Sequence, residues 1–240
     1  MHTLILILLL LLVHPGIQEK TALQRPVQKI RLVLQHRVGR EPLVLGNSYR
    51  NVLGDTITIY KFKYYLSNFA VTDSSGNTVR LPLQYRLVDE ADAASKTIEL
   101  SVPVDRIRDI RFMIGVDSTR NVSGIQEGAL DPLKGMFWTW NTGYIMAKLE
   151  GSSPSSKIAM QSFTYHIGGY RAPYATMRWV TLPAGNRNTN KLAVVVDINQ
   201  WFKHKTALSI AKTPVCHSPG ELASQIADNI SGMFSNDSNP

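Results

Sequence analysis

The sequence predicts an all-β fold: an antiparallel β-sandwich of about nine or ten strands with one C-terminal α-helix. Short segments rich in β-branched and aromatic residues recur along the chain, with Gly, Pro, Asn and Ser between them, and only one segment has helical periodicity. The length of 240 residues suits one sandwich, because such domains reach about 250 residues. We expect a single domain over residues 28–234, preceded by a signal peptide and followed by a disordered tail at 235–240.

The clearest strand covers residues 30–38, where apolar and polar side chains alternate and His36 falls among the aliphatic positions. Residues 56–60 and 62–71 form the next strands, and the polar run 73–77 makes a turn. The remaining strands are expected at residues 79–88, 97–102, 107–115, 144–150, 159–167, 178–182 and 191–198.

One helix is predicted over residues 219–233. Ser218 and Glu221 have the spacing of a capping box, and Pro219 stands at the first helical position. Apolar residues then recur every four positions, which gives the helix a face to pack against the sandwich. These residues are Leu222, Ile226, Ile230 and Phe234.

The amino terminus predicts export. Residues 4–13 are ten consecutive aliphatic residues, whereas a helix needs about 20 to span a bilayer and a secretory signal has an apolar core of about 7–15. We expect a signal peptide over residues 1–18 and a mature protein that is periplasmic or otherwise extracytoplasmic, with no membrane span. Cys216 is the only cysteine, so the chain forms no internal disulfide, and we expect a small buried apolar residue there.

The motifs and the charge pattern argue against several functions. The sequence has no G-x-S-x-G elbow, no H-E-x-x-H and no P-loop. A hydrolase is a weak candidate, because its only support is a set of carboxylates with no distinctive spacing. It also lacks C-x-x-C-H, so no c-type haem is attached. The net charge of +8 comes from scattered cations, which does not favour nucleic-acid binding. We expect that the protein is not an enzyme.

Four histidines lie beyond the signal region. His36 is either a hydrogen-bonded core residue or a metal ligand, because a buried imidazole needs partners for both nitrogens. His166 precedes two glycines at the end of a strand and is either a rim residue or a binding residue. His204, between two lysines, is expected to be solvated. Cys216 and His217 could offer a soft ligand pair, but their place just before the helix favours a role in the turn. Since imidazole suits copper and zinc, two histidines in an exported sandwich suggest a copper site.

Trp138 and Trp140 lie in the most unusual segment, an aromatic run over residues 136–144. In a strand, residues two apart point to the same face. Three roles are open for this pair: core packing, a stacking surface for sugar rings, or a redox-active tryptophan beside a metal.

Six segments, taken in order, resemble the MbnP-like family of exported proteins. The resemblance covers most of the chain, from about residue 30 to the C-terminal helix, and implies a β-sandwich domain outside the cytoplasm. The segments are FKYYLSNF (62–69), YRLVD (85–89), GVDS (115–118), GALDP (128–132), MFWTWNTGY (136–144) and YHIGG (165–169).

The resemblance implies a link to copper. In characterised members of this family, histidines hold Cu(I) near a tryptophan that a separate di-haem cytochrome c peroxidase-like partner oxidises to kynurenine. Carried over to this sequence, the copper ligands would be His36 and His166, and the oxidised or site-lining residue would be Trp138 or Trp140. The sequence departs from some copper-binding relatives because it has no histidine between His36 and His166.

We therefore expect an exported copper-binding protein that holds Cu(I) for uptake, storage or delivery, with His36 and His166 converging from separate strands. The alternative is a metal-free extracytoplasmic binding module that recognises a glycan or a surface protein through Trp138 and Trp140.

Overall fold

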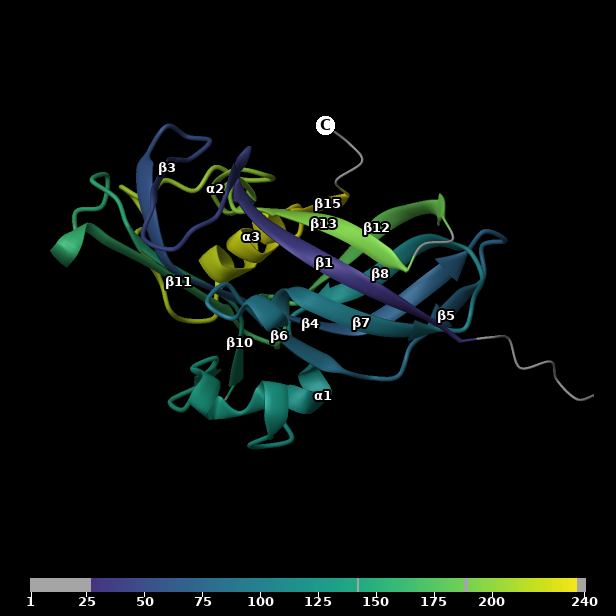
Figure 1. The fold of residues 1–240 in the computed structure, drawn as a ribbon. Coiled ribbons are helices and arrows are strands. Elements are labelled where there is room, and N and C mark those ends of the chain that lie inside the picture. The colour runs from purple at the N-terminus through teal and green to yellow at the C-terminus, as the bar shows by residue number, and fades with distance from the viewer. Residues whose placement is uncertain (1–26, 142, 188–189, 237–240) are drawn as a thin grey trace, which may run out of the picture.

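The computed structural model describes residues 27–141, 143–187 and 190–236 (Figure 1). The described part of the chain is mostly β, with 47% of its residues in strands and 15% in helices. The strands form two sheets, one of five strands and one of ten. The expected signal peptide at 1–18 lies outside the described residues.

The five-stranded sheet is built around β1 (Gln28–Val38). On one side β1 pairs in parallel with β13, and on the other it pairs antiparallel with β7 and β2. The last strand, β15, pairs with β13 and contains Ser235 and Asn236, two residues that the sequence analysis assigned to the tail. The bounds of the partner strands are β2 (Glu41–Pro42), β7 (Thr97–Val102), β13 (Lys191–Asp197) and β15 (Phe234–Asn236).

The ten-stranded sheet is organised by β4 (Thr56–Asp73), an 18-residue strand. The order of the main strands in this sheet is β12-β8-β4-β10-β11-β14, and shorter strands pair with β4 and β10. The register of β4 on β8 shifts between Ser67 and Ala70, where Asn68 has φ +54°, and such bulges bend a strand. The other strands are β3 (Ser48–Arg50), β5 (Thr78–Arg80), β6 (Tyr85–Asp89), β8 (Ile107–Ile114), β9 (Phe137–Trp138), β10 (Gly143–Ser152), β11 (Ser162–Gly168), β12 (Arg178–Arg187) and β14 (Val215–Cys216).

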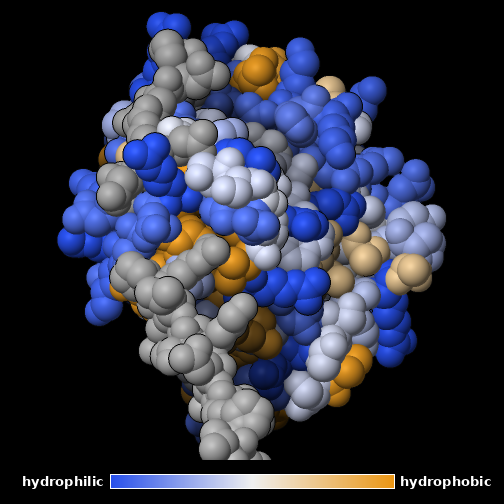
Figure 2. All heavy atoms as spheres, turned by 90° about the vertical axis from the view of Figure 1, so that its right-hand side faces the viewer, coloured by the Kyte–Doolittle hydropathy of each residue, from blue (hydrophilic) through white to orange (hydrophobic). Residues whose placement is uncertain are grey.

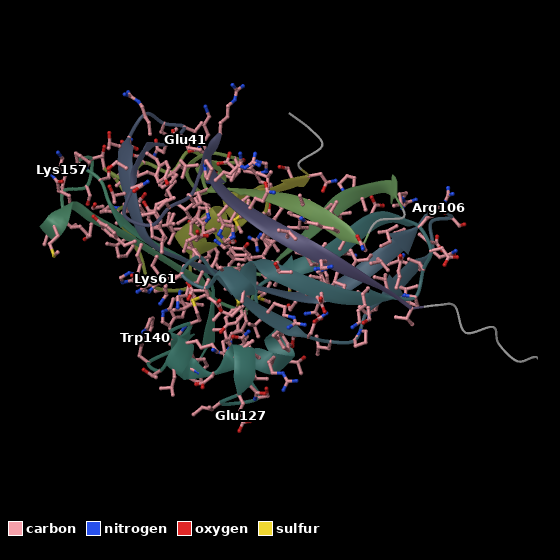
Figure 3. All side chains as sticks on the ribbon, in the orientation of Figure 1. Glu41, Lys61, Arg106, Glu127, Trp140 and Lys157 are labelled. Atoms are coloured by element: carbon pink, nitrogen blue, oxygen red, sulfur yellow. The ribbon has the colours of Figure 1, made fainter. Side chains whose placement is uncertain are left out.

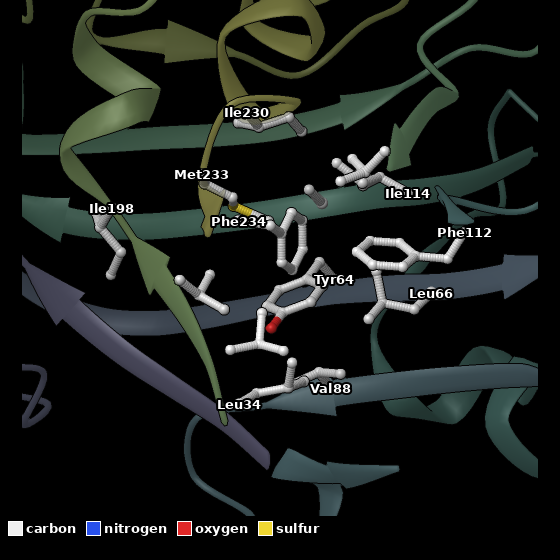
Figure 4. Packing of buried hydrophobic residues seen from close by; sticks show 14 of the residues in the cluster. Leu34, Tyr64, Leu66, Val88, Phe112, Ile114, Ile198, Ile230, Met233 and Phe234 are labelled. Atoms are coloured by element: carbon white, nitrogen blue, oxygen red, sulfur yellow. The ribbon is translucent and has the colours of Figure 1, made fainter. Parts of the chain in front are cut away.

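The main core lies between the two sheets. Alternation puts every second residue of β1 inward, so that Leu32 and Leu34 are buried. Tyr64 from β4, Phe112 from β8 and Phe234 from β15 meet there (Figure 4). Removing one such aromatic ring from water stabilises the fold by about 1.5–3 kcal/mol.

The outer face of the ten-stranded sheet carries a second, smaller apolar cluster. Tyr65 points opposite to Tyr64 and packs there with Met136, Trp138 and Tyr144. The chain between β8 and β10 supplies this cover, and it lies beneath the sheet in Figure 1, on the side away from β1 and β13. This cover positions the aromatic run on the outer face.

Three α-helices occur among the described residues: α1 (Ser118–Asn121), α2 (Asn199–Phe202) and α3 (Glu221–Ile230). The expected C-terminal helix is α3, which contacts α2 and β11 and buries Ile226 and Ile230 in the main core. Four 3₁₀ helices accompany them at Ala93–Lys96, Gly128–Leu130, Pro132–Lys134 and Ala159–Gln161.

The start and end of α3 correct the sequence prediction. The N-cap is Gly220, whose φ of +156° is one that glycine adopts more readily than other residues, and no side chain caps the helix, so Ser218 and Pro219 lie before it. The helix ends at Ile230 and the chain turns, which places Phe234 in β15. The capping-box spacing was present, but the helix starts at Glu221 with Gly220 as its N-cap, so Ser218 lies too far back to cap the first turn.

The prediction of a mostly-β protein with a helix near the C-terminus is confirmed. The prediction of a purely antiparallel sandwich of nine or ten strands was wrong in two respects. Fifteen strands occur among the described residues. The predicted strands 56–60 and 62–71 form the single strand β4, the predicted strand 79–88 divides into β5 and β6, and five further strands of two or three residues (β2, β3, β9, β14 and β15) are too short to leave a pattern in the sequence. The sheets are also mixed, because β1–β13 and β11–β14 are parallel, and the larger sheet curls into a half-barrel.

The surface is mainly hydrophilic on the side that faces the viewer in Figure 2, which is the right-hand side of Figure 1. In Figure 3, Arg106 is labelled on this right-hand side of the molecule. Trp140 is labelled below the ten-stranded sheet, far from Arg106. In the part of the chain that the structure describes, no helix is long and apolar enough to cross a membrane.

Candidate functional site

His36 is buried on the core side of β1, with 6% of its surface exposed. Its Nε2 lies 2.9 Å from the Tyr64 hydroxyl, and its Nδ1 lies 2.5 Å from Glu90 Oε2. Lys96 Nζ donates to the other oxygen of Glu90 at 3.0 Å. Both ring nitrogens of His36 therefore have protein partners, as expected for a hydrogen-bonded core histidine.

The charges around His36 follow from this burial. Desolvation lowers the pKa of His36 below its ordinary value, against the opposing effect of the hydrogen bond to Glu90. Burial alone would raise the pKa of Glu90, but hydrogen bonds from His36 and Lys96 outweigh it and hold that pKa below its ordinary value. At neutral pH the ring is thus uncharged: Nδ1–H donates to the carboxylate and Nε2 accepts from Tyr64.

We expect His36 to make the protein less stable as the pH falls below about 6.5. A histidine whose pKa is lowered by folding takes up its proton more readily in the unfolded chain, so stability is complete above the unfolded value and declines below it, by at most about 1.4 kcal/mol per pH unit for one proton. Chemical denaturation between pH 7.5 and 5 should show a smaller slope for His36→Gln than for wild type.

The exposed histidine supplies the control for this experiment. His204→Gln should keep the wild-type slope, because His204 is solvent-exposed. The pKa of His217 is also lowered, so His217 adds to the pH dependence of stability with the same sign. It is present in both wild type and His36→Gln and therefore does not affect the difference between their slopes. Equal slopes for wild type and His36→Gln would contradict the assignment.

The structure does not bring His36 and His166 together. Along the ladder, His166 of β11 pairs with Lys148 of β10, which pairs with Lys63 of β4. Tyr64 follows Lys63 and therefore points to the opposite face of the sheet. Since His36 binds Tyr64 on the core side, His166 lies on the outer face, with the sheet between the two imidazoles.

His166 is instead paired with His217. The two rings stack with their centroids 4.4 Å apart and an interplanar angle of 24°. The parallel pairing of β11 with β14 aligns Tyr165 with Cys216, which sets the next residues, His166 and His217, side by side. Desolvation and then repulsion from His166 lower the pKa of His217, which favours the neutral form of the His217 ring.

Glu150 holds His166 from one side. Its Oε1 lies 2.9 Å from His166 Nε2, and its Oε2 accepts from Lys61 Nζ at 2.8 Å. The hydrogen bond from His166, supported by Lys61, lowers the pKa of Glu150 to about 2. Within the described residues, the structure shows no hydrogen bond to His166 Nδ1 or to either ring nitrogen of His217.

Cys216 does not join this pair. Its side chain is buried in the main core, and burial raises the pKa of the thiol to about 11, so the sulfur is protonated at neutral pH. This agrees with the expected small apolar residue. Among the described residues, no group of three or more His, Cys, Asp or Glu side chains is arranged to hold a metal ion.

Trp138 lies along the same outer face as His166. Its ring covers Gly168, where an added Cβ would come within 2.7 Å of the indole. Gly168 is two residues beyond His166 on β11, which puts the two positions about 6.7 Å apart along one face of the strand. The tryptophan thus forms a wall beside the histidine pair.

The prediction that Trp138 and Trp140 share one face of a strand was wrong for Trp140. The strand β9 ends at Trp138, and Trp140 lies in the turn that follows, with 65% of its surface exposed. The two rings still touch, with centroids 5.4 Å apart and a tilt of 39°. Together they border a groove of about 650 Å³.

The His166–His217 pair was not predicted from the sequence. The two strands that align these residues are separated by about fifty residues in the chain, and β14 has only two residues. No periodic pattern marks so short a strand. The available signal was weak: His217 follows Cys216, a residue expected to be buried, so that alternation would turn the histidine outward.

These features define a two-sheet β protein with a histidine pair and an aromatic groove on the outer face of its larger sheet. The chain belongs to the MbnP family, whose sequence profile matches residues 27–218. Its fold is similar to that of MbnP from Methylosinus trichosporium, with a TM-score of 0.55 and 16% sequence identity over 82% of this chain and 83% of that one. No curated protein matches the sequence.

Proposed function

We propose that the protein is an extracytoplasmic copper-binding protein that holds Cu(I) at His166 and His217, for uptake, storage or delivery. The stacked pair of imidazoles on the outer face, 4.4 Å between centroids, carries the proposal. Membership of the MbnP family supports the link to copper. The protein would act as a carrier of the ion and not as an enzyme.

The donor set fits a monovalent copper ion. Imidazole nitrogens are good copper ligands, and Cu(I) accepts as few as two of them. Glu150 accepts from His166 and would fix the orientation of that ring, as carboxylates do beside many metal-binding histidines. Lys61 and Lys148 lie near this carboxylate, and their positive charges disfavour a divalent ion more than a monovalent one.

His36 is a poorer candidate for the same ion. Its nitrogens are occupied by Tyr64 and Glu90, and the positive charge of Lys96 lies beside that carboxylate. The proposal therefore keeps His166 from the predicted ligand pair and replaces His36 with His217.

Trp138 and Trp140 keep their proposed place beside the metal. Trp138 is buried against Gly168, whereas Trp140 is largely exposed. If a di-haem peroxidase-like partner oxidises one of them to kynurenine, the exposed Trp140 is the ring that such a partner would reach directly.

The test is a Cu(I) titration of the mature protein against a competing chelator. We expect one tight equivalent for wild type. His166→Gln and His217→Gln should each weaken binding at least about 100-fold, and Glu150→Gln should weaken it about 10–100-fold, the usual effect of losing a residue that orients a ligand. His36→Gln and the exposed His204→Gln serve as matched controls and should bind like wild type.

Two outcomes would contradict the proposal. Absence of a tight equivalent in wild type would remove the copper function, and loss of binding in His36→Gln with retention in His166→Gln would move the site to the core. The intact mass of natively expressed protein, measured on the same sample, would show whether a tryptophan has been converted to kynurenine. The same measurement on Trp140→Phe would show whether the converted residue is Trp140 or Trp138.

A further inference from the structure

The groove beside Trp138 and Trp140 is a separate cavity with its own chemistry. Its volume is about 650 Å³, within the roughly 300–1,000 Å³ of small-ligand sites. Four segments that are distant in sequence form its walls: the end of α1, the turn from β9 to β10, the loop after β11, and the residues just before α3.

Buried polar contacts hold these walls in place. Asn121 of α1 is 1% exposed; its Oδ1 accepts from the Tyr144 backbone N–H at 2.9 Å, and its Nδ2 donates to the Val116 carbonyl at 2.8 Å. The loop after β11 is closed by Thr176, whose backbone N–H and hydroxyl both donate to the Gly169 carbonyl. The groove is therefore preformed, which lowers the entropic cost of binding a ligand.

The apolar wall is more exposed than a folded protein normally leaves such residues. Trp140 is 65% exposed, Val122 is 65% exposed and Tyr174 is 43% exposed, and all three line the groove. Trp138 supports Trp140 from behind. A contiguous exposed apolar surface of this kind marks a binding site, and the indole of Trp140 offers a flat face for stacking.

The polar wall is basic and amide-rich. Asn141 and Arg171 are exposed at the groove, and the Arg171 guanidinium lies over the Tyr170 ring, 5.2 Å from its centroid. No Asp or Glu occurs among the described residues that line the groove. These donors suit hydroxyl groups and carboxylates, and a single cation is too few to follow a nucleic-acid backbone.

We propose that this groove binds carbohydrate: one sugar ring stacks on Trp140, and its hydroxyl or carboxylate groups accept hydrogen bonds from Asn141 and Arg171. This inference does not depend on copper binding, since it uses none of the histidines. It assigns the groove to neutral or uronic-acid oligosaccharides, because the flat apolar face and the donor-rich edge match the two sides of a pyranose.

The test uses isothermal titration calorimetry with three probes: cellotetraose, chitotetraose and trigalacturonate. The protein is copper-free and has an intact mass that shows unmodified tryptophans. We expect saturable binding of at least one probe, weakened at least tenfold in Trp140→Ala. Because Trp140 is exposed, this variant should keep the wild-type melting temperature, which is measured in parallel.

Trp179 provides the matched control. It is 47% exposed on β12 and lies under the Arg111 guanidinium, 4.2 Å from its ring centroid, but it does not line the groove. Trp179→Ala should bind the probe like wild type. The proposal is overturned if no probe binds, if Trp140→Ala binds as well as wild type, or if a dT oligonucleotide binds more tightly than every sugar and loses affinity in Trp140→Ala.

Discussion

Replacing Gly151 by alanine is expected to lower the free energy of unfolding by about 3 kcal/mol or more. Gly151 is the penultimate residue of β10 and lies where the register against β4 shifts. An added Cβ would come within 2.3 Å of the Thr58 carbonyl oxygen and 2.6 Å of the Phe163 ring. The first of these atoms is backbone and cannot rotate away, so the strands must separate. Overpacking typically costs about 1–3 kcal/mol and occasionally more, and a clash with backbone belongs at the upper end.

Gly143 on the same strand is the matched control for this prediction. An added Cβ there would lie 3.5 Å from Asn121 Oδ1 and 3.6 Å from the Tyr170 ring, which are ordinary contact distances. Gly143→Ala should therefore change stability by less than about 1 kcal/mol. Urea denaturation of the two variants measures the difference; similar stabilities would show that β10 can shift to accept the methyl group.

Replacing Asn229 by alanine should cost about 2–4 kcal/mol and lower the melting temperature by about 6–12 °C. Asn229 lies on α3 and is 1% exposed. Its Oδ1 accepts from the backbone N–H groups of Lys205 and Thr206, and its Nδ2 donates to the carbonyls of Trp201 and Thr206. Alanine leaves all four backbone groups without this partner.

Gln225 tests whether the effect belongs to this network or to the helix as a whole. It lies one turn before Asn229 on α3 and is exposed, and its side-chain amide donates to Glu221. Gln225→Ala should change stability by less than about 0.5 kcal/mol. A loss as large as that of Asn229→Ala would show that the effect is not specific to the Asn229 hydrogen bonds, since alanine itself favours the helix. Thermal unfolding followed by circular dichroism distinguishes the two.

The strands that the sequence predicted best are those whose pattern is local. Residues 30–38 alternate cleanly because one face of β1 packs on the core, and the structure has this strand. The region 79–88 was predicted as one strand, but it divides into β5 and β6. Pairing partners were not predictable, because the parallel contact of β1 with β13 joins distant segments that carry no mutual signal.

The site residues were likewise predictable only as far as the local pattern of the sequence allows. The pattern correctly put His36 on an inward face, but its partner Glu90 belongs to a charged loop that the sequence offers no reason to bury. The pattern gave His166 a place at a strand end, but not the face to which it points. That face depends on the register of three strands, and a shift of one residue would have turned the imidazole toward the core.

The parallel pairing of β1 with β13 has a consequence for how the chain is made. Arg31 pairs with Lys191, and Val194 in turn pairs with Asn236, so β1 waits for residues 191–236 to be synthesised before its sheet can close on that side. Folds dominated by such distant contacts form slowly. Until then the only long partner strand available to β1 in this sheet, among the described residues, is β7.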